Sequence, residues 1–318
     1  MQSIKSFVDT PQEPVARLRA LRSVTLCSPT ADSAAEFYSQ VWGLGTVESE
    51  RGAAWLRGTG AEHHILEVRH AERNALGKIA FAVATPAEVD EAGRRLSALG
   101  VPMLVEPGPL EQVGGGYGLQ LIDPEGRLVE LSANLEAVVP QDPEGRAAVP
   151  RKLAHVVLNT VDIDAACAFY TKVLGMRISD WSEHQMAFLR CNADHHVIAF
   201  NAAEWTSINH VAYEMGSIDH FMRGIGRLKH HDMLPLWGPG RHGPGSNTFS
   251  YFADPAGLVC EYTSEVAQVD EDAWLCRVWR RTPELSDLWG TAGPPSRDVR
   301  EHMAGVPDPG YRPARTAS

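Results

Sequence analysis

The segment Leu153-Ala-His-Val-Val-Leu158 repeats the pattern of Leu21-Arg-Ser-Val-Thr-Leu26, which stands 132 residues earlier. Other pairs of segments keep this separation to within one residue. They are Phe37-Tyr38 with Phe169-Tyr170, His63-His64 with His195-His196, and Asp123-Pro124 with Asp254-Pro255. So constant a register over so long a stretch indicates a duplicated structural unit. The fold therefore follows from what one copy can form.

The second copy shows the order of elements most clearly. The apolar, β-branched run around Val156 predicts a strand, and the helical spacing of apolar residues over 165–174 predicts a helix that Gly175 ends. Short alternating segments predict antiparallel strands, and a second helix is predicted over 217–229. Asp254-Pro-Ala-Gly257 has the residues that a tight turn between two closing strands favours. We predict an α+β fold of two tandem domains, each a pair of βαβββ modules that form a curved mixed sheet.

Segments without a counterpart in the other copy mark the domain limits. A polar stretch bounded by prolines separates the copies, and the chain from Glu265 onward, with three tryptophans, matches nothing in the first copy. We expect this tail to pack on the body and to fray toward its end. The predicted parts are an N-terminal arm over 1–20, a first domain over 21–139, a linker over 140–150, a second domain over 151–264 and a C-terminal tail over 265–318.

The composition is that of a water-soluble globular protein, with 318 residues, 44% hydrophobic and 22% charged. A formal net charge of −11 argues against a nucleic acid or an anionic membrane as partner. The five cysteines form no Cys-x-x-Cys pair, which is typical of reduced thiols. The first residues lack the apolar core of a signal peptide, and no apolar run is long enough to cross a membrane. We expect a cytoplasmic protein that acts on a small molecule.

Three matching positions matter chemically, and the two copies differ at two of them. The first copy has Ser23, Lys78 and Glu130, whereas the second has His155, His210 and Glu261. A lone strand histidine is usually structural, but two histidines gained in one copy are hard to attribute to core packing, which disfavours a ring that can become charged. If the first, middle and last strands of the second copy are neighbours, the three side chains converge. They then form the two-histidine, one-carboxylate triad of non-haem Fe(II) oxygenases.

The segment from Gly238 to Tyr262 extends this pattern, with His242 nine residues before Tyr251 and Tyr251 ten residues before Glu261. Together with the triad, over roughly residues 20 to 264, it resembles the type I extradiol ring-cleaving dioxygenases of the vicinal oxygen chelate superfamily. In that family, a metal-free N-terminal domain precedes a C-terminal domain that binds Fe(II) or occasionally Mn(II). The resemblance implies that the metal ligands are His155, His210 and Glu261.

The resemblance also implies roles for other residues. It places the acid/base histidine 14 residues before the second ligand, at His196, with His195 as the alternate. We expect this pair on a strand, so that only one of the two rings enters the pocket. Tyr251 would hydrogen-bond a substrate oxygen, and His242 would lie in the pocket wall near the substrate. Further pocket walls are predicted at Val157, Phe188, Trp181 and Trp237.

The implied reaction is cleavage of a catechol by dioxygen next to the diol, giving a 2-hydroxymuconic semialdehyde type product in aromatic catabolism. Because the sequence shows no arginine cluster, an alkyl or aryl substituent on the ring is favoured over a carboxylate. A homo-oligomer is expected. A glyoxalase-like isomerase, a hydroquinone dioxygenase and a non-catalytic ligand-sequestering protein are the alternatives. The sequence leaves open whether Tyr251 and Glu261 share a face, since a one-residue shift of the hairpin decides this.

Overall fold

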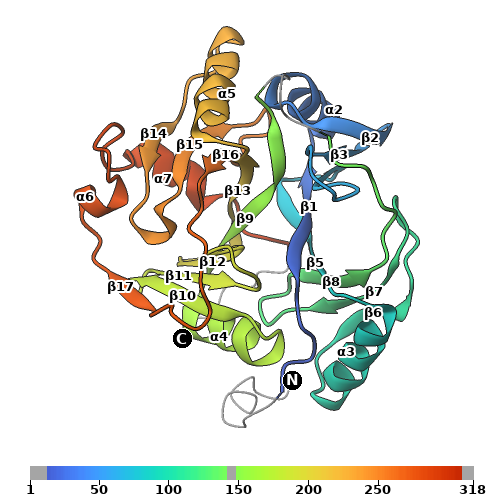
Figure 1. The fold of residues 1–318 in the computed structure, drawn as a ribbon. Helices are drawn as coiled ribbons and strands as arrows, with labels where there is room; N and C mark the ends of the chain where they lie inside the picture. Colours follow the sequence, from blue (N-terminus) through green and yellow to red (C-terminus); the bar gives the residue numbers. More distant parts are fainter. Residues whose placement is uncertain (1–12, 142–147, 310–318) are drawn as a thin grey trace, which may run out of the picture.

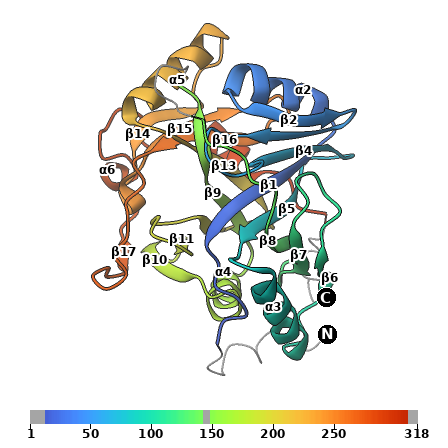
Figure 2. The same cartoon turned by 45° about the vertical axis from the view of Figure 1, so that its right-hand side comes forward.

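The computed structural model describes residues 13–141 and 148–309 and consists of two mixed β-sheets with few helices (Figure 1). One sheet has eight strands in the order β2-β3-β4-β1-β5-β8-β7-β6, and the other has nine in the order β14-β15-β16-β13-β9-β12-β11-β10-β17. Strands β1 and β9 lie side by side at the centre of the molecule (Figures 1 and 2). The predicted α+β fold with two tandem domains is confirmed.

The first sheet is built from two βαβββ modules. Its elements are β1 (Ala20–Ser28), α2 (Ala31–Glu36) with a π-helical continuation (Phe37–Trp42), β2 (Gly45–Glu50), β3 (Ala53–Arg57), β4 (Leu66–His70), β5 (Ala75–Ala82), α3 (Pro86–Ala98), β6 (Met103–Pro109), β7 (Tyr117–Ile122) and β8 (Leu128–Ala133).

The second sheet repeats this order. Its elements are β9 (Pro150–Thr160), α4 (Ile163–Ala168) with a π-helical continuation (Phe169–Val173), β10 (Arg177–Ser182), β11 (Met186–Arg190), β12 (Ile198–Ala202), β13 (Ser207–Met215), α5 (Ile218–His230), β14 (Trp237–Arg241), a 3-10 turn (Pro244–Ser246), β15 (Thr248–Ala253) and β16 (Val259–Ser264).

The C-terminal tail adds three elements to the second domain. They are β17 (Arg277–Trp279), α6 (Pro283–Ser286) and α7 (Arg297–Ala304). β17 pairs in parallel with β10 and so extends the sheet by one strand. The exact limits predicted for the arm, linker, domains and tail stay a prediction, and their portions over 1–12, 142–147 and 310–318 lie outside the described residues. Among the described helices, none has the length and apolar character needed to cross a membrane.

Local sequence explains how the helices begin and end. The Asp162 side chain accepts a hydrogen bond of 3.0 Å from the Ala165 backbone N–H, which satisfies a donor that the helix itself leaves unpaired. Ser217 caps α5 in the same way through the His220 N–H, at 3.1 Å. The helix predicted over 165–174 is α-helical only as far as Ala168 and then widens into the π-helical turn.

The repeated tyrosines and aspartates join the two domains. The Tyr38 hydroxyl donates to Asp254 Oδ2 at 3.1 Å, and its counterpart Tyr170 donates to Asp123 Oδ2 at 3.2 Å. All four side chains are buried, so each hydroxyl needs such a partner. Each domain therefore supplies the tyrosine of one contact and the aspartate of the other, which accounts for the presence of both residues in both copies.

Aromatic packing strengthens the same contact between the domains. Trp42, which is fully buried, stacks on Tyr262 with ring centroids 3.8 Å apart. Its ring also meets Tyr213 and Phe252 edge-on. Buried residues of both domains form one continuous hydrophobic core. Burial of each ring of this size stabilises the folded protein by roughly 1.5–3 kcal/mol.

A lysine ammonium holds the buried carboxylate of the first domain. Lys78 Nζ lies 2.7 Å from Glu130 Oε2, and the amides of Gln112 and Gln120 donate to the same carboxylate at 3.1 Å each. Burial raises the pKa of Glu130, but the Lys78 charge and these hydrogen bonds lower it further, so that the net shift is downward. Glu130 is therefore ionised and fully paired without any metal.

Substitution of Lys78 by methionine is expected to lower the free energy of unfolding by about 3–5 kcal/mol, because a buried carboxylate loses its counter-charge. Chemical denaturation at neutral pH measures the change. The double variant Lys78→Met/Glu130→Leu removes both charges and should recover most of the loss. Equal stability of the single variant and the parent protein would show that Glu130 does not depend on this ammonium.

Candidate active site

Three neighbouring strands carry the predicted metal ligands. β13 lies between β9 and β16, and Ala212 on β13 pairs with His155 on one side and with Glu261 on the other. His210 stands two residues before Ala212 and so projects from the same face of β13. The first, middle and last strands are thus neighbours, and one potential ligand atom from each of His155, His210 and Glu261 lies within 4.8 Å of the others.

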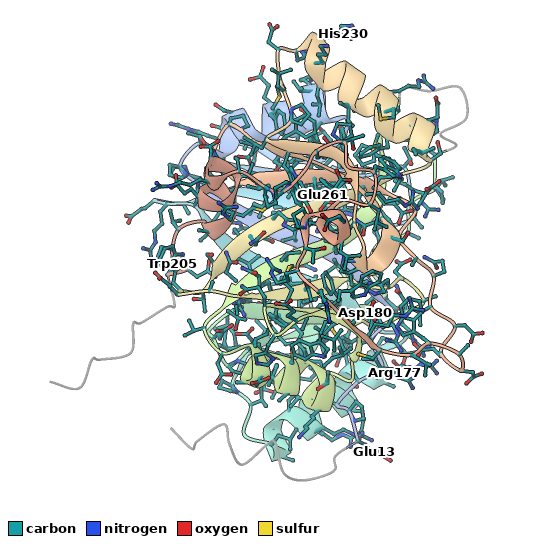
Figure 3. All side chains as sticks on the ribbon, turned by 90° about the vertical axis from the view of Figure 1, so that its left-hand side faces the viewer. Glu13, Arg177, Asp180, Trp205, His230 and Glu261 are labelled. Carbon is teal, nitrogen blue, oxygen red and sulfur yellow. The ribbon has the colours of Figure 1, made fainter. Side chains whose placement is uncertain are left out.

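The ligand atoms meet around one carboxylate oxygen. His155 Nε2 lies 3.1 Å and His210 Nε2 lies 3.2 Å from Glu261 Oε2. Figure 3 labels Glu261 near the middle of the molecule, and its side chain is fully buried. Burial raises the pKa of Glu261, but the two imidazoles outweigh this effect and bring the pKa to about 2.

His155 Nε2 and Glu261 Oε2 are hydrogen-bonded to each other, but other polar atoms of the triad have no such partner. The Asn209 side-chain oxygen accepts from His210 Nδ1 at 2.7 Å, which directs the Nε2 lone pair toward Glu261. Within the described residues, His210 Nε2 and Glu261 Oε1 have no hydrogen-bond partner although both are buried. Buried polar atoms without partners are rare, and two nitrogens with one carboxylate oxygen suit a divalent transition metal. The residues present therefore fit a metal ion.

A cavity of about 480 Å³ opens beside the triad. This volume is within the usual range for a small-molecule site. Val157, Phe188 and Trp237 line it. Trp181 does not line it, because side chains alternate along β10: Ser182 faces the cavity, whereas Trp181 packs toward the core and stacks on His184.

Tyr251 and His242 form a hydrogen-bonded pair in the cavity wall. Tyr251 stands directly opposite Glu261 in the hairpin, so the two residues share a face. His242 Nδ1 donates to the Ser286 carbonyl at 3.0 Å, so Nε2 accepts from the Tyr251 hydroxyl at 2.9 Å. Burial lowers the pKa of His242 to about 4 and, with the nearby Glu261, raises the pKa of Tyr251 well above its usual value. Both groups are therefore neutral.

His195 and His196 lie in a loop and not on the predicted strand. β12 begins only at Ile198, because the preceding segment bonds to the tail: the His195 N–H donates to the Ala267 carbonyl at 2.8 Å. Of these two histidines, only His196 lines the cavity, where its ring centroid lies 4.3 Å from that of His155. Burial lowers the pKa of His196 well below its usual value.

The tail supplies a part of the cavity that the sequence did not reveal. Arg280, Arg281 and Arg300 line the cavity, are exposed, and make no ion pair with any described residue. They form an arginine group at the mouth, contrary to the expectation that no such cluster exists. In the sequence, Arg280 and Arg281 are adjacent and Arg300 follows later in the tail, but the tail has no counterpart in the first copy that would place these residues near the triad.

Comparisons with known proteins agree with this geometry. The family model described as Glyoxalase/Bleomycin resistance protein/Dioxygenase superfamily matches residues 20–131 and 152–262. Metapyrocatechase 2 of Cupriavidus necator is 31% identical over 226 residues, 64% of this chain and 68% of the relative. The iron-dependent extradiol dioxygenase of Rhodococcus jostii strain RHA1 is 30% identical over 69% of this chain and 78% of its own. The Mn(II)-bound glyoxalase from Novosphingobium aromaticivorans is 38% identical, with a TM-score of 0.85 over 89% of this chain and 94% of its own.

His155→Ala and His210→Ala are each expected to lower the affinity for Fe(II) or Mn(II) by about 10- to 100-fold or more, since each variant removes one of the three protein ligands. Metal content after anaerobic loading and desalting measures this loss. His184→Ala, an exposed histidine outside the cavity wall, serves as the matched control and should retain the metal. Full metal retention by either ligand variant would remove that histidine from the metal site.

Proposed function

Because the chain belongs to the glyoxalase, bleomycin resistance protein and dioxygenase superfamily, and within it to the extradiol dioxygenases, we propose that it cleaves a catechol with dioxygen next to the diol. The observation that carries the proposal is the triad of His155, His210 and Glu261, which fits a metal ion, beside a cavity that also presents His196 and Tyr251. The product would be of the 2-hydroxymuconic semialdehyde type.

In this proposal, the triad holds Fe(II), with Mn(II) as the alternative. The iron- and manganese-binding relatives support this choice of metals. A bound Fe(II) supplies the path by which electrons pass from the diol to dioxygen. All three ligands come from one sheet face, so the side toward the cavity stays open for the diol and the gas.

His196 acts as the acid/base residue. Its ring lines the cavity next to His155, within reach of a diol held at the triad. Low solvent access keeps the imidazole neutral, so it can accept a proton from the diol and return it later in the reaction. His195, the alternate in the sequence-based prediction, does not line the cavity, which favours His196 for this role.

Tyr251 stabilises charge on a substrate oxygen, and His242 positions Tyr251. The Tyr251 phenol stays protonated, and its hydroxyl can rotate from His242 toward an oxygen of a bound diol. His242 keeps the ring of Tyr251 in place, since the Ser286 carbonyl fixes the opposite nitrogen of His242. The neutral Tyr251 hydroxyl, as a hydrogen-bond donor at this place, favours an anionic substrate oxygen over a neutral one.

The cavity wall suggests which catechols fit. Val157, Phe188 and Met186 form an apolar wall, whereas Arg280, Arg281 and Arg300 stand at the mouth. We infer that the ring carries a substituent with an apolar stem. An acidic group at its far end is accepted because it would meet these arginines, which make no ion pair with any described residue. This replaces the expectation of a purely apolar substituent.

The test of the proposal is anaerobic loading with Fe(II), followed by oxygen uptake with catechol, an alkylcatechol, an arylcatechol and a catechol with a carboxyalkyl arm. Uptake of one dioxygen per diol, with a yellow ring-opened product, is expected for at least one of them. No uptake with any diol by a protein that holds its metal would contradict the proposal.

Isomerisation of a hemithioacetal is the second candidate function, because the 38% identical structural relative is named a glyoxalase. The two reactions differ in their need for a gas. An isomerase moves protons within its substrate and consumes no dioxygen. Turnover of the glutathione hemithioacetal of methylglyoxal without oxygen uptake, together with inactivity on every diol, would favour this second function.

His196→Phe is expected to keep the metal and to lower kcat by about 10²- to 10⁴-fold, since general acid/base catalysis contributes on that order. Steady-state oxygen uptake and metal content, measured on the same samples, separate the two effects. Unchanged kcat in the metal-loaded variant would exclude His196 as the acid/base residue.

A further inference from the structure

A buried chain of hydrogen bonds leads from the second sheet to His196. Asp180 Oδ2 lies 3.1 Å from His195 Nε2, and His195 Nδ1 lies 3.0 Å from His196 Nδ1. The three side chains are at most 3% exposed. Figure 3 labels Asp180, on β10, and Glu261, on β16. At the other end of the hydrogen-bonded chain, the ring of His196 lies beside that of His155, with centroids 4.3 Å apart.

The direction of each hydrogen bond follows from the charge of Asp180. Burial raises the pKa of Asp180, but hydrogen bonds from His195, Trp279 and Arg277 lower it further, so the carboxylate is ionised and can only accept. His195 must therefore donate from Nε2. A neutral imidazole has one N–H, so His195 Nδ1 accepts, and His196 must donate from Nδ1. His196 Nε2 is then left without a hydrogen.

The tail completes this arrangement. The Trp279 indole N–H donates to Asp180 Oδ2 at 2.7 Å, and the Arg277 backbone N–H donates to Asp180 Oδ1 at 2.8 Å. Both donors come from β17, which pairs with β10. Gly245 covers the histidine pair so closely that a Cβ there would lie 3.1 Å from His195 Nδ1, which holds both rings in place.

The first domain offers an internal comparison. His63 Nδ1 and His64 Nδ1 lie 3.1 Å apart, so the histidine pair itself belongs to the repeated fold. The position that corresponds to Asp180 is Glu48, which is exposed, and the nearest carboxylate to His63 Nε2 is that of the exposed Glu136, at 3.8 Å. Among the described residues, a buried carboxylate therefore lies beside the histidine pair only in the domain with the triad.

We infer that Asp180 and His195 are positioning residues that fix the proton of His196 on Nδ1 and thereby present a bare Nε2 to the cavity. Nε2 makes no hydrogen bond with any residue that the structure describes, and His196 lines the cavity. The inference rests on the proposed function in one respect: the bare nitrogen is the atom that takes the diol proton. The tautomer itself does not depend on which reaction the site performs.

Nitrogen NMR of the histidine rings tests the tautomer directly. The protein is labelled with ¹⁵N-histidine, loaded with Zn(II) as a diamagnetic ion, and measured at neutral pH, with His196→Gln to assign the signals. The expected result is hydrogen on Nδ1 and none on Nε2 for His196, with the reverse for His195. Hydrogen on Nε2 of His196 would overturn the inference, whatever the enzyme's substrate.

Variants then separate positioning from packing. Asp180→Asn and His195→Phe are expected to lower kcat by about 10- to 100-fold, with KM changed by less than about threefold and the metal retained. Trp279→Phe removes a single donor and should have a smaller effect in the same direction. His63→Phe is the matched control, since it disrupts the equivalent pair in the first domain and should leave kcat unchanged.

The NMR spectra of the variants decide between the two explanations. If Asp180 fixes the proton, His196 in Asp180→Asn should populate both tautomers. A purely structural role predicts that His196 keeps its Nδ1 hydrogen while stability falls as it does in His63→Phe, and this outcome would overturn the inference. If the tautomers are as expected but no diol is turned over, the proposed function fails and the positioning role stands.

Discussion

A carboxylate buried on the last strand of each domain needs a positive partner, and the two domains meet this need differently. In the first, Lys78 supplies an ammonium and Glu130 is fully hydrogen-bonded. In the second, imidazoles replace the ammonium, and Glu261 keeps an oxygen without a partner among the described residues. A buried charge left this way is costly, so the second domain is complete only with a cation. The fold is common to both domains, and the chemistry follows from this one difference.

The C-terminal tail connects this constraint to catalysis. Its Ser286 carbonyl orients His242, which in turn holds Tyr251. Its strand β17 supplies two donors to Asp180. The same segment places arginines at the cavity mouth. The duplicated domains thus provide the sheet and the triad, whereas a segment outside the repeat determines how the neighbouring side chains are held and what can enter.

Sequence reasoning succeeded where one copy could be compared with the other. The constant register predicted the tandem modules, and the substitutions at two positions indicated the triad that the sheet brings together. It failed where no comparison was available, as for the arginines of the tail. It also misplaced His195 on a strand, because contacts with the tail keep β12 from beginning before Ile198. It assigned Trp181 to the cavity because the register of β10, which decides which of its side chains face the cavity, cannot be read from the sequence. Side chains that meet across long loops leave no periodic pattern in sequence.

Anomalous diffraction from crystals of the protein loaded with Fe(II) or Mn(II) shows whether the triad binds a metal, since it locates each metal independently of activity. We expect a single peak within bonding distance of His155, His210 and Glu261, and none beside Glu130, where Lys78 already neutralises the carboxylate. A metal peak at another place, a second peak in the first domain, or an intact triad that binds no ion under saturating metal would contradict this expectation.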